Sequence, residues 1–185
     1  NGSTFFSAET LVYGEEWWRS DGTAEGTVLV QDAVPGSLGL QPRYPVLFQG
    51  RLFFSGKHPV YGWELFATDG SSSGTALIKD IAPGNLSSEP REFMVAGGNL
   101  FFIADDKAHG RELWKTDGTE AGTVLVKDIR AGIEGSDPRH PNVLNGRLFL
   151  WANDGIHARE LWSSDGTTAG TTLLKDIYEG GTDSG

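Results

Sequence analysis

The 185-residue chain contains no cysteine, a single methionine and few basic side chains: 15 lysine and arginine residues stand against 25 aspartate and glutamate residues. The absence of cysteine excludes disulfide bonds, thiolate metal ligands and cysteine nucleophiles. The formal charge is −10 and the basic residues are scattered along the chain, which argues against nucleic acid as a partner. No apolar run approaches the length of a transmembrane helix, so the sequence predicts no membrane insertion.

The residues that are present indicate a folded protein. Hydrophobic residues make up 38% of the chain, and 10 phenylalanines are available for a core, which is too apolar and aromatic a composition for a disordered chain. The 26 glycines are spread over the whole length, a pattern that indicates many turns.

A period of 48 residues organises the chain. It is carried without insertion by Gly2, Gly50, Gly98 and Gly146, and by Asp21, Asp69, Asp117 and Asp165. We predict a single repeat domain over residues 1–185, with repeats at 2–49, 50–97, 98–145 and 146–185, the last one incomplete. A repeat of this length cannot bury its own apolar faces and must stack on copies of itself, as in propellers and solenoids.

The third repeat shows the expected elements most clearly. Apolar runs at 90–95 and 99–103 flank a two-glycine turn, which indicates a β-hairpin. Residues 112–116 predict a third strand, an Asp-Gly turn at 117–122 reverses the chain, and residues 123–129 predict a fourth strand. Four antiparallel strands per repeat are the content of one propeller blade.

The predicted fold is therefore all-β: a β-propeller, or propeller segment, of four 48-residue, four-stranded antiparallel blades. Successive apolar residues within the strands favour blades that are packed on both faces. The glycine and β-branched content argues against helices. A parallel β-helix is the main alternative, but its coils are usually shorter and lack the Asn-Gly and Asp-Gly turns present in this chain.

The chain length implies a missing strand. Four repeats would take 192 residues, seven more than the chain has, and by the period these seven correspond to residues 42–48, the first strand of a blade. The first blade is therefore expected to lack its inner strand. Because an unpaired strand edge invites association, we expect either part of a longer repeat array or a homodimer that closes a ring.

Two segments match each other closely, Glu112–Thr119 and Glu160–Thr167, and each is followed by Ala-Gly-Thr and Lys-Asp-Ile. They resemble the bacterial ELWxxDGT repeat family, and the resemblance extends over essentially the whole chain. The other copies depart from the pattern with Trp17 in place of leucine, and with Phe66 and Ser71 in place of tryptophan and threonine. The resemblance implies propeller-like repeats in large, often secreted or cell-surface bacterial proteins, without a common enzymatic activity.

Two sets of recurring side chains are interpreted as structural. The mid-strand aromatic residue could stack on a sugar, but its exchange between tryptophan and phenylalanine favours packing between blades. A catalytic carboxylate is needed once or twice, so a glutamate in every repeat favours satisfying a turn or pairing with a base. The sets are Trp18, Phe66, Trp114 and Trp162, and Glu16, Glu64, Glu112 and Glu160.

Recurring arginines and aspartates are also interpreted as structural. Arginines follow proline at the start of a blade at Arg43, Arg91 and Arg139. We expect these arginines to pair with recurring glutamate or aspartate residues on neighbouring strands. The aspartates of the Asp-Gly turns, which are Asp21, Asp69, Asp117 and Asp165, are expected to cap those turns through hydrogen bonds to the backbone.

We predict no cofactor and no metal. Calcium is the alternative, because loops such as Asp105-Asp106 and Asn153-Asp154 add oxygen ligands, although no twelve-residue calcium loop is present.

One loop position alternates between two polar aromatic residue types, at Tyr13, Tyr61, His109 and His157. Both types can stack and donate hydrogen bonds, as a ligand or glycan site requires, although exposed loops also vary without function. These four residues are the ligand-binding hypothesis of the sequence.

Dedicated catalytic motifs are absent, and the repeats are nearly alike, whereas an enzyme combines unlike residues around one centre. We therefore predict that the chain is not an enzyme. The leading interpretation is a non-enzymatic repeat scaffold or interaction module of a secreted or cell-surface bacterial protein, with a protein or glycan as its partner. The alternative is a carbohydrate-binding, lectin-like propeller with rim sites between blades.

Overall fold

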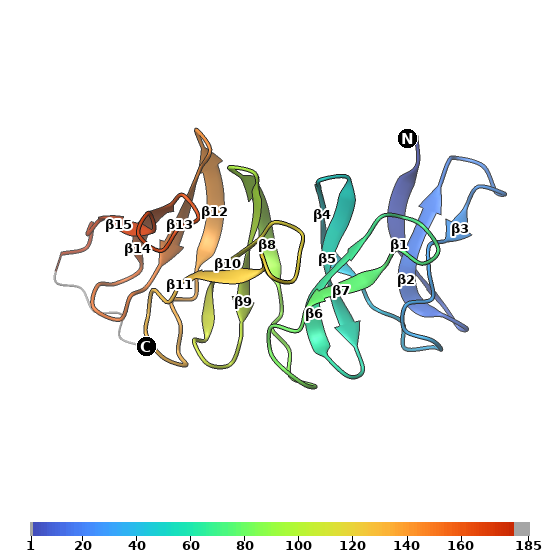
Figure 1. Cartoon of the computed structure of the whole chain (residues 1–185), viewed down its shortest axis with the longest axis horizontal. Helices are drawn as coiled ribbons and strands as arrows, with labels where there is room; N and C mark the ends of the chain where they lie inside the picture. The colour runs from blue at the N-terminus through green and yellow to red at the C-terminus, as the bar shows by residue number, and fades with distance from the viewer. Residues whose placement is uncertain (1, 180–185) are drawn as a thin grey trace. The chain divides into compact units, whose positions relative to one another are not determined.

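The computed structural model describes residues 2–179, and these residues form β-strands and turns without a helix. The strands pair in four antiparallel sheets, three of four strands and one of three (Figure 1). The prediction of an all-β chain with one antiparallel sheet per repeat is confirmed at this level. The last residues of the fourth predicted repeat, 180–185, lie outside the described part of the chain. Within that part, no helix has the length and apolarity to cross a membrane.

Each sheet follows the order of the chain, so that every strand pairs with its neighbour in sequence. The first sheet contains β1 (Thr4–Thr10), β2 (Gly14–Ser20) and β3 (Val28–Leu29). The second contains β4 (Arg43–Phe48), β5 (Arg51–His58), β6 (Gly62–Thr68) and β7 (Ala76–Lys79). The third contains β8 (Arg91–Ala96), β9 (Asn99–Asp105), β10 (Arg111–Thr116) and β11 (Val124–Lys127). The fourth contains β12 (Arg139–Leu144), β13 (Arg147–Ala152), β14 (Glu160–Ser164) and β15 (Thr172–Lys175). Among residues 2–179, the first sheet has three strands and no counterpart of β4, as the repeat count predicted.

The first two strands of each complete sheet are joined by a two-residue turn with positive φ at both positions. The φ angles are 49° and 76° at Gln49-Gly50, 56° and 79° at Gly97-Gly98, and 51° and 77° at Asn145-Gly146. Positive φ at both central residues defines a type I′ turn, whose twist matches that of the flanking strands. The predicted hairpins are therefore present at the predicted residues.

The second strand of the third sheet, β9, is buried on both faces. Five successive residues of β9, Leu100 to Ala104, are buried, and Phe102 is fully enclosed. Because side chains alternate between the two faces of a strand, such a run requires cover on both sides. Enclosing one phenylalanine side chain contributes roughly 2–3 kcal/mol.

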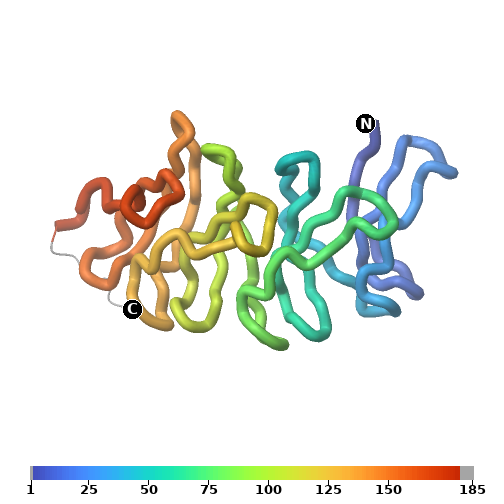
Figure 2. Tube along the Cα trace, in the orientation of Figure 1, coloured from blue at the N-terminus to red at the C-terminus, as the bar shows by residue number. Residues whose placement is uncertain are grey.

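The chain divides into two compact units, one ending at Ser87 and the other beginning at Ser88, and each unit holds two sheets. Figure 2 follows the course of the chain within each unit. In the first unit, Trp17 of β2 meets Phe54 of β5 edge-on, with ring centroids 5.6 Å apart. In the second unit, Phe101 of β9 and Trp162 of β14 share one buried cluster. Side chains of both sheets thus build the core of each unit.

Candidate functional site

The topology assigns the loops of each sheet to two ends. In the second sheet the β5–β6 loop, the segment leaving β7 and the start of β4 lie at one end, because neighbouring strands run antiparallel. The β4–β5 and β6–β7 turns lie at the other. We call the first the glutamate end and the second the Asp-Gly end, after the residues that recur at each.

The recurring glutamates lie near the start of the third strand and are buried: Glu16, Glu64, Glu112 and Glu160 are at most 1% exposed. Each accepts hydrogen bonds from backbone N–H groups of the segment that leaves the same sheet. Oε1 of Glu16 accepts from Val34 and Leu40, both at 3.0 Å, and from Ala33 at 3.2 Å. Equivalent bonds join Glu64 to Ile81 and Ala82, and Glu160 to Tyr178. The glutamate therefore fixes the course of the exit segment.

Glu112 makes the fullest set of these bonds. Its Oε1 accepts from the backbone N–H of Arg130 at 3.0 Å and of Ser136 at 2.9 Å, and its Oε2 accepts from the Ser136 hydroxyl at 2.6 Å. Burial raises the pKa of Glu112 to about 7, against the opposing effect of the Ser136 and Arg130 hydrogen bonds. Its oxygens are enclosed and engaged by the loop, so they do not face a substrate.

Backbone contacts fix the loops of the glutamate end further. In the third sheet, Gly110 of the β9–β10 loop lies against Gly135 of the exit segment, and a Cβ atom on either glycine would collide with the backbone of the other loop. Arg111 and Gly135 form a parallel bridge, and the Asp137 N–H donates to the Arg111 carbonyl at 3.0 Å. Gly14 and Gly39 repeat this contact in the first sheet. These contacts fix the loop and the exit segment against each other at the glutamate end of the first sheet and of the third sheet.

The four positions of the ligand hypothesis all lie in the loop between the second and third strands, at this end. Tyr13 is exposed, and its backbone N–H donates to Thr10 Oγ1 at 2.9 Å. The Tyr61 ring stacks on His58 with centroids 4.7 Å apart. The two tyrosines thus have different surroundings, one open and one covered by a neighbouring ring.

The two histidines are each held by an aspartate three residues earlier. His109 Nδ1 lies 2.7 Å from Asp106 Oδ2, and His157 Nδ1 lies 2.8 Å from Asp154 Oδ2. The hydrogen bond to Asp106 raises the pKa of His109 above its ordinary value, with a smaller lowering by burial, and the charge of Asp128 adds to the rise. Hydrogen bonding to Asp154 raises the pKa of His157 in the same way. With Nδ1 engaged, Nε2 is the ring atom left for another group.

The arginines at the start of the first strands are also at the glutamate end, but they do not pair with the recurring acids. Arg91 and Arg139 both contact Asp137, with Arg91 Nη2 at 3.5 Å and Arg139 Nη2 at 2.6 Å. Arg159 adds a third guanidinium at 3.2 Å from the same carboxylate and also donates to the Asp137 carbonyl. Arg43 instead lies over the Trp63 ring, 4.2 Å from its centroid. We call Arg91, Asp137, Arg139 and Arg159 the arginine cluster.

Backbone bulges accompany these arginines. The register of each first strand shifts just after the arginine, and the next residue has positive φ: 56° at Tyr44, 54° at Glu92 and 52° at His140. Positive φ is uncommon outside glycine, and bulges re-aim side chains at the edges of sheets. The recurring Pro-Arg pair marks these positions in the sequence, but no sequence motif predicted the bulge that follows the arginine.

The recurring aromatic residues are core residues. Phe66, Trp114 and Trp162 are 5–6% exposed, whereas Trp18 is half-buried. In the second unit the Lys127 ammonium lies 5.6 Å from the Trp162 ring, across the two sheets. Phe66 and Trp162, which belong to the buried clusters of their units, are therefore placed for packing between sheets. The same role for Trp18 and Trp114 stays a prediction.

The Asp-Gly end is organised by side chains of the turns themselves. Asp117 Oδ1 accepts from the Thr119 N–H at 2.9 Å and from its hydroxyl at 2.7 Å, and Thr119 Oγ1 accepts from the Gly122 N–H at 2.9 Å. Hydrogen bonds from Thr119 lower the pKa of Asp117. Asp21 and Asp165 make the same bonds.

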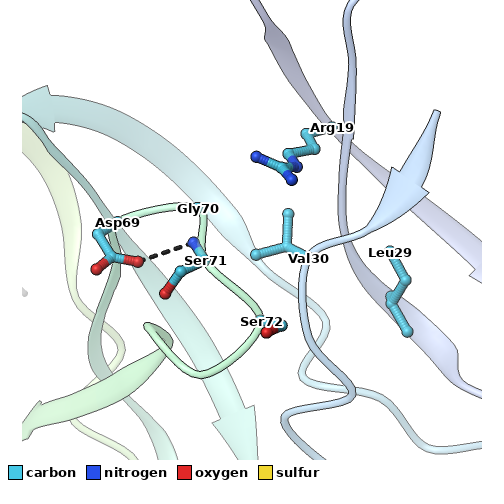
Figure 3. Close-up of a pocket in the computed structure, with 7 residues that line it drawn as sticks. All are labelled: Arg19, Leu29, Val30, Asp69, Gly70, Ser71 and Ser72. Carbon is cyan, nitrogen blue, oxygen red and sulfur yellow. Dashed lines mark hydrogen bonds between the residues drawn. The ribbon is translucent and has the colours of Figure 1, made fainter. Parts of the chain in front are cut away.

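The turn after β6 differs from the others, and a hollow of about 410 Å³ adjoins it in the first unit (Figure 3). Its lining is Arg19, Leu29, Val30, Asp69, Gly70, Ser71 and Ser72. Asp69 caps the turn through the Ser71 N–H at 2.8 Å, but the Gly74 N–H donates to the Ser71 carbonyl instead of to a threonine hydroxyl. The sequence shows that serines replace the usual residues at 71 and 72, but it does not predict the hollow.

No group of three or more histidine, aspartate or glutamate side chains within residues 2–179 is placed to hold a metal ion. Asp106 Oδ1, one of the suggested calcium ligands, accepts from the Ala108 and His109 N–H groups. That the chain holds no metal stays a prediction, with calcium as its alternative. One carboxylate oxygen is buried without a hydrogen bond in each of Asp32, Asp80, Asp128 and Asp176.

Comparison with known proteins gives likeness in fold only. Neither protein-family models nor curated protein sequences match the chain. A crystal structure of puromycin hydrolase, and one of a mutant of that enzyme complexed with PGG, each superpose with a TM-score of 0.57 at 17% identity, covering 94% of this chain. The chain spans 28% of the length of the hydrolase chain. A structure titled Bacteroides ovatus Xyloglucan PUL GH43B gives a TM-score of 0.41 at 14% identity, covering 89% of this chain and 37% of that chain.

The prediction that the chain is not an enzyme is wrong in its reasoning and is corrected. It took near-identical repeats as evidence against an enzyme, yet a fold similar to almost the whole of this chain forms part of a hydrolase. A repetitive all-β segment can belong to an enzyme whose other parts carry the chemistry. At 17% identity the likeness transfers no catalytic residue to this chain.

Proposed function

We propose that the chain is a β-propeller-type repeat scaffold of a larger secreted or cell-surface bacterial protein, and that it binds a carboxylate-rich segment of a protein partner at the glutamate end. The arginine cluster is the observation that carries this proposal. Its guanidinium groups surround one carboxylate in a chain whose net charge is −10. A concentration of positive charge in an acidic chain favours an acidic partner over a neutral one.

The cluster has unused binding capacity. Three arginines and one aspartate leave an excess of two positive charges. Each guanidinium carries five N–H donors in a planar fork that suits carboxylates, and Asp137 alone cannot accept them all. Arg139 is the most accessible member, with 54% of its side chain exposed. Since the surrounding loops are fixed by the buried glutamates and by backbone contacts, a partner would meet the cluster without a large ordering cost.

Binding of a fluorescein-labelled hexaglutamate peptide, measured by fluorescence anisotropy, tests this proposal. Arg139→Ala should weaken binding by about tenfold, as expected for loss of a charge-assisted hydrogen bond, and added salt should weaken binding to the wild-type chain. Arg147→Ala is the matched control, because it removes the same charge at the Asp-Gly end of the same sheet. Equal losses in the two variants would mean that only net charge matters, and the proposal would fail.

We also propose that the sheets belong to a ring completed either by further repeats of a longer chain or by a second copy. The 48-residue period and the three-stranded first sheet support this arrangement. Size-exclusion chromatography with light scattering separates the two routes. A dimer supports closure by a second copy, and a monomer supports a longer array.

Carbohydrate binding is the second candidate function. It is favoured by the histidines at 109 and 157, whose half-exposed rings are oriented by Asp106 and Asp154 and can donate from Nε2. A glycan array probed with the intact chain and with a His109→Ala/His157→Ala variant tests it. Binding that both proteins share would place the glycan elsewhere, and an array without signal would remove this candidate.

A further inference from the structure

The hollow of the first unit exists because a contact found in the second unit is missing there. In the second unit, the Thr168 hydroxyl of the β14–β15 turn donates to the Val126 carbonyl of the preceding sheet at 2.8 Å. By the 48-residue period, the equivalent residues of the first unit are Ser72 and Val30, and both line the hollow. The turn with two serines follows a different hydrogen-bond pattern: no bond joins Ser72 to Val30, and the two sheets are tied instead by the Thr75 N–H, which donates to Gln31 Oε1 at 3.0 Å.

The residue opposite the turn also differs between the units. Lys115 lies beside the Asp-Gly turn of the second unit, where its Cδ is 3.7 Å from the position that a Cβ atom on Gly166 would take. Its counterpart Arg19 is exposed, and it makes no ion pair or hydrogen bond with another described side chain. Figure 3 shows its guanidinium directed toward Ser71 across Val30. The hollow thus has on one side a guanidinium whose charge acts on Asp21 but which forms no salt bridge with a described side chain.

We propose that this hollow binds the carboxylate and hydroxyl groups of a hexuronic acid residue, as found in acidic polysaccharides. The inference deepens the carbohydrate-binding candidate, giving it a ligand class and a location separate from the histidine loops. The volume of about 410 Å³ is within the range of small-ligand sites and suits a monosaccharide.

The lining matches this ligand group by group. The Arg19 guanidinium accommodates a carboxylate in a bidentate pair. Asp69 belongs to the turn that lines the hollow. Hydrogen bonds from Ser71 lower the pKa of its carboxyl group, so Asp69 remains an anion that accepts hydrogen bonds from sugar hydroxyls. The Ser71 and Ser72 side chains add hydroxyl groups, and the half-buried Leu29 offers an apolar surface for the C–H face of the ring. A neutral sugar would leave Arg19 unpaired.

An NMR titration of the 15N-labelled intact chain with galacturonate tests the assignment. We expect saturable shifts of the Val30, Ser71 and Ser72 amides with a millimolar dissociation constant, since the hollow is open and the ligand is small. Arg19→Ala should weaken binding about tenfold or more, whereas Lys115→Ala, the equivalent change in the second unit, should leave it unchanged. Saturable shifts confined to the histidine loops would overturn the location and still support carbohydrate binding.

A filling variant provides an independent test. Ser71→Thr/Ser72→Thr restores the two residues that the second unit has at 167 and 168, and it should close the hollow and abolish the galacturonate shifts without destabilising the chain. Galactose and alanine are the comparison probes, a neutral sugar and a zwitterion. The assignment is overturned if either of them binds as tightly as galacturonate, or if the filled variant binds like the wild type.

Discussion

Replacing Glu112 by glutamine should make the stability of the second unit less dependent on pH. The carboxyl group is buried, and its pKa is about 7 in the folded chain against an ordinary value of 4.5. Folding therefore retains a proton that the unfolded chain releases near pH 4.5. The free energy of unfolding falls as the pH rises from 4.5 to 7, and it stays lowered above pH 7.

The size of this effect follows from the pKa difference. At ~1.4 kcal/mol per pKa unit, a rise from 4.5 to about 7 corresponds to about 3 kcal/mol. Glutamine cannot ionise, so this contribution disappears in Glu112→Gln. Its carbonyl oxygen can still accept from the Arg130 and Ser136 N–H groups, and its NH₂ group can donate to the Ser136 hydroxyl. We expect the stability difference between variant and wild type to grow by about 2.5 kcal/mol in favour of the variant as the pH rises from about 5 to about 8.

Urea unfolding followed by tryptophan fluorescence over that pH range measures the difference directly. The pKa of Glu16 is also raised to about 7, but Glu16 is present in both proteins, so its contribution to the pH dependence of stability cancels in the comparison. Glu112→Ala serves as the control for hydrogen bonding, since it leaves the Ser136 and Arg130 N–H groups without their acceptor; it should lose ~2–4 kcal/mol at pH 5, and because it also lacks the titrating carboxyl group, that loss should shrink at higher pH in parallel with the change seen for glutamine. Parallel pH profiles for the wild type and the glutamine variant would refute the argument that burial raises the pKa of Glu112.

Two further predictions concern the turns and the histidine loops. Gly122→Ala should destabilise the chain by ~1–2 kcal/mol, because the new Cβ collides with the Asp117 carboxylate. In the double variant Asp117→Ala/Gly122→Ala the two losses of stability should not add, which a double-mutant cycle measured by thermal unfolding would show. Additive losses would contradict the contact. Asp106→Asn should lower the pKa of His109 toward its ordinary value while leaving His157 unchanged, which an NMR titration of the two rings can follow; an unshifted His109 would mean that Asp106 does not govern it.

The fold could be predicted because its determinants are local and recur in every repeat. Dipeptides such as Asn145-Gly146 specify type I′ turns by their φ angles, and successive buried residues in β9 require cover on both faces. The arginine cluster could not be predicted in the same way. Its central acid, Asp137, is not repeated: the equivalent residues are Gln41 and Glu89. The hollow could not be predicted from the sequence either. It depends on the absence of a hydrogen bond between Ser72 and Val30, which the serine pair alone does not indicate.

The segments that leave the first and third sheets are each hydrogen-bonded to two sheets. The backbone N–H of Leu40 donates to Glu16 in the first sheet, and its carbonyl accepts from Lys57 in the second. Ser136 is held in the same two-sided way by Glu112 and Asn153, and in both cases the glutamate precedes its partner by 24 residues. An inserted or deleted residue between them would break one of the two ties. Evolution can therefore lengthen or shorten such an array only by whole repeats, which accounts for a period that four copies keep without a single insertion.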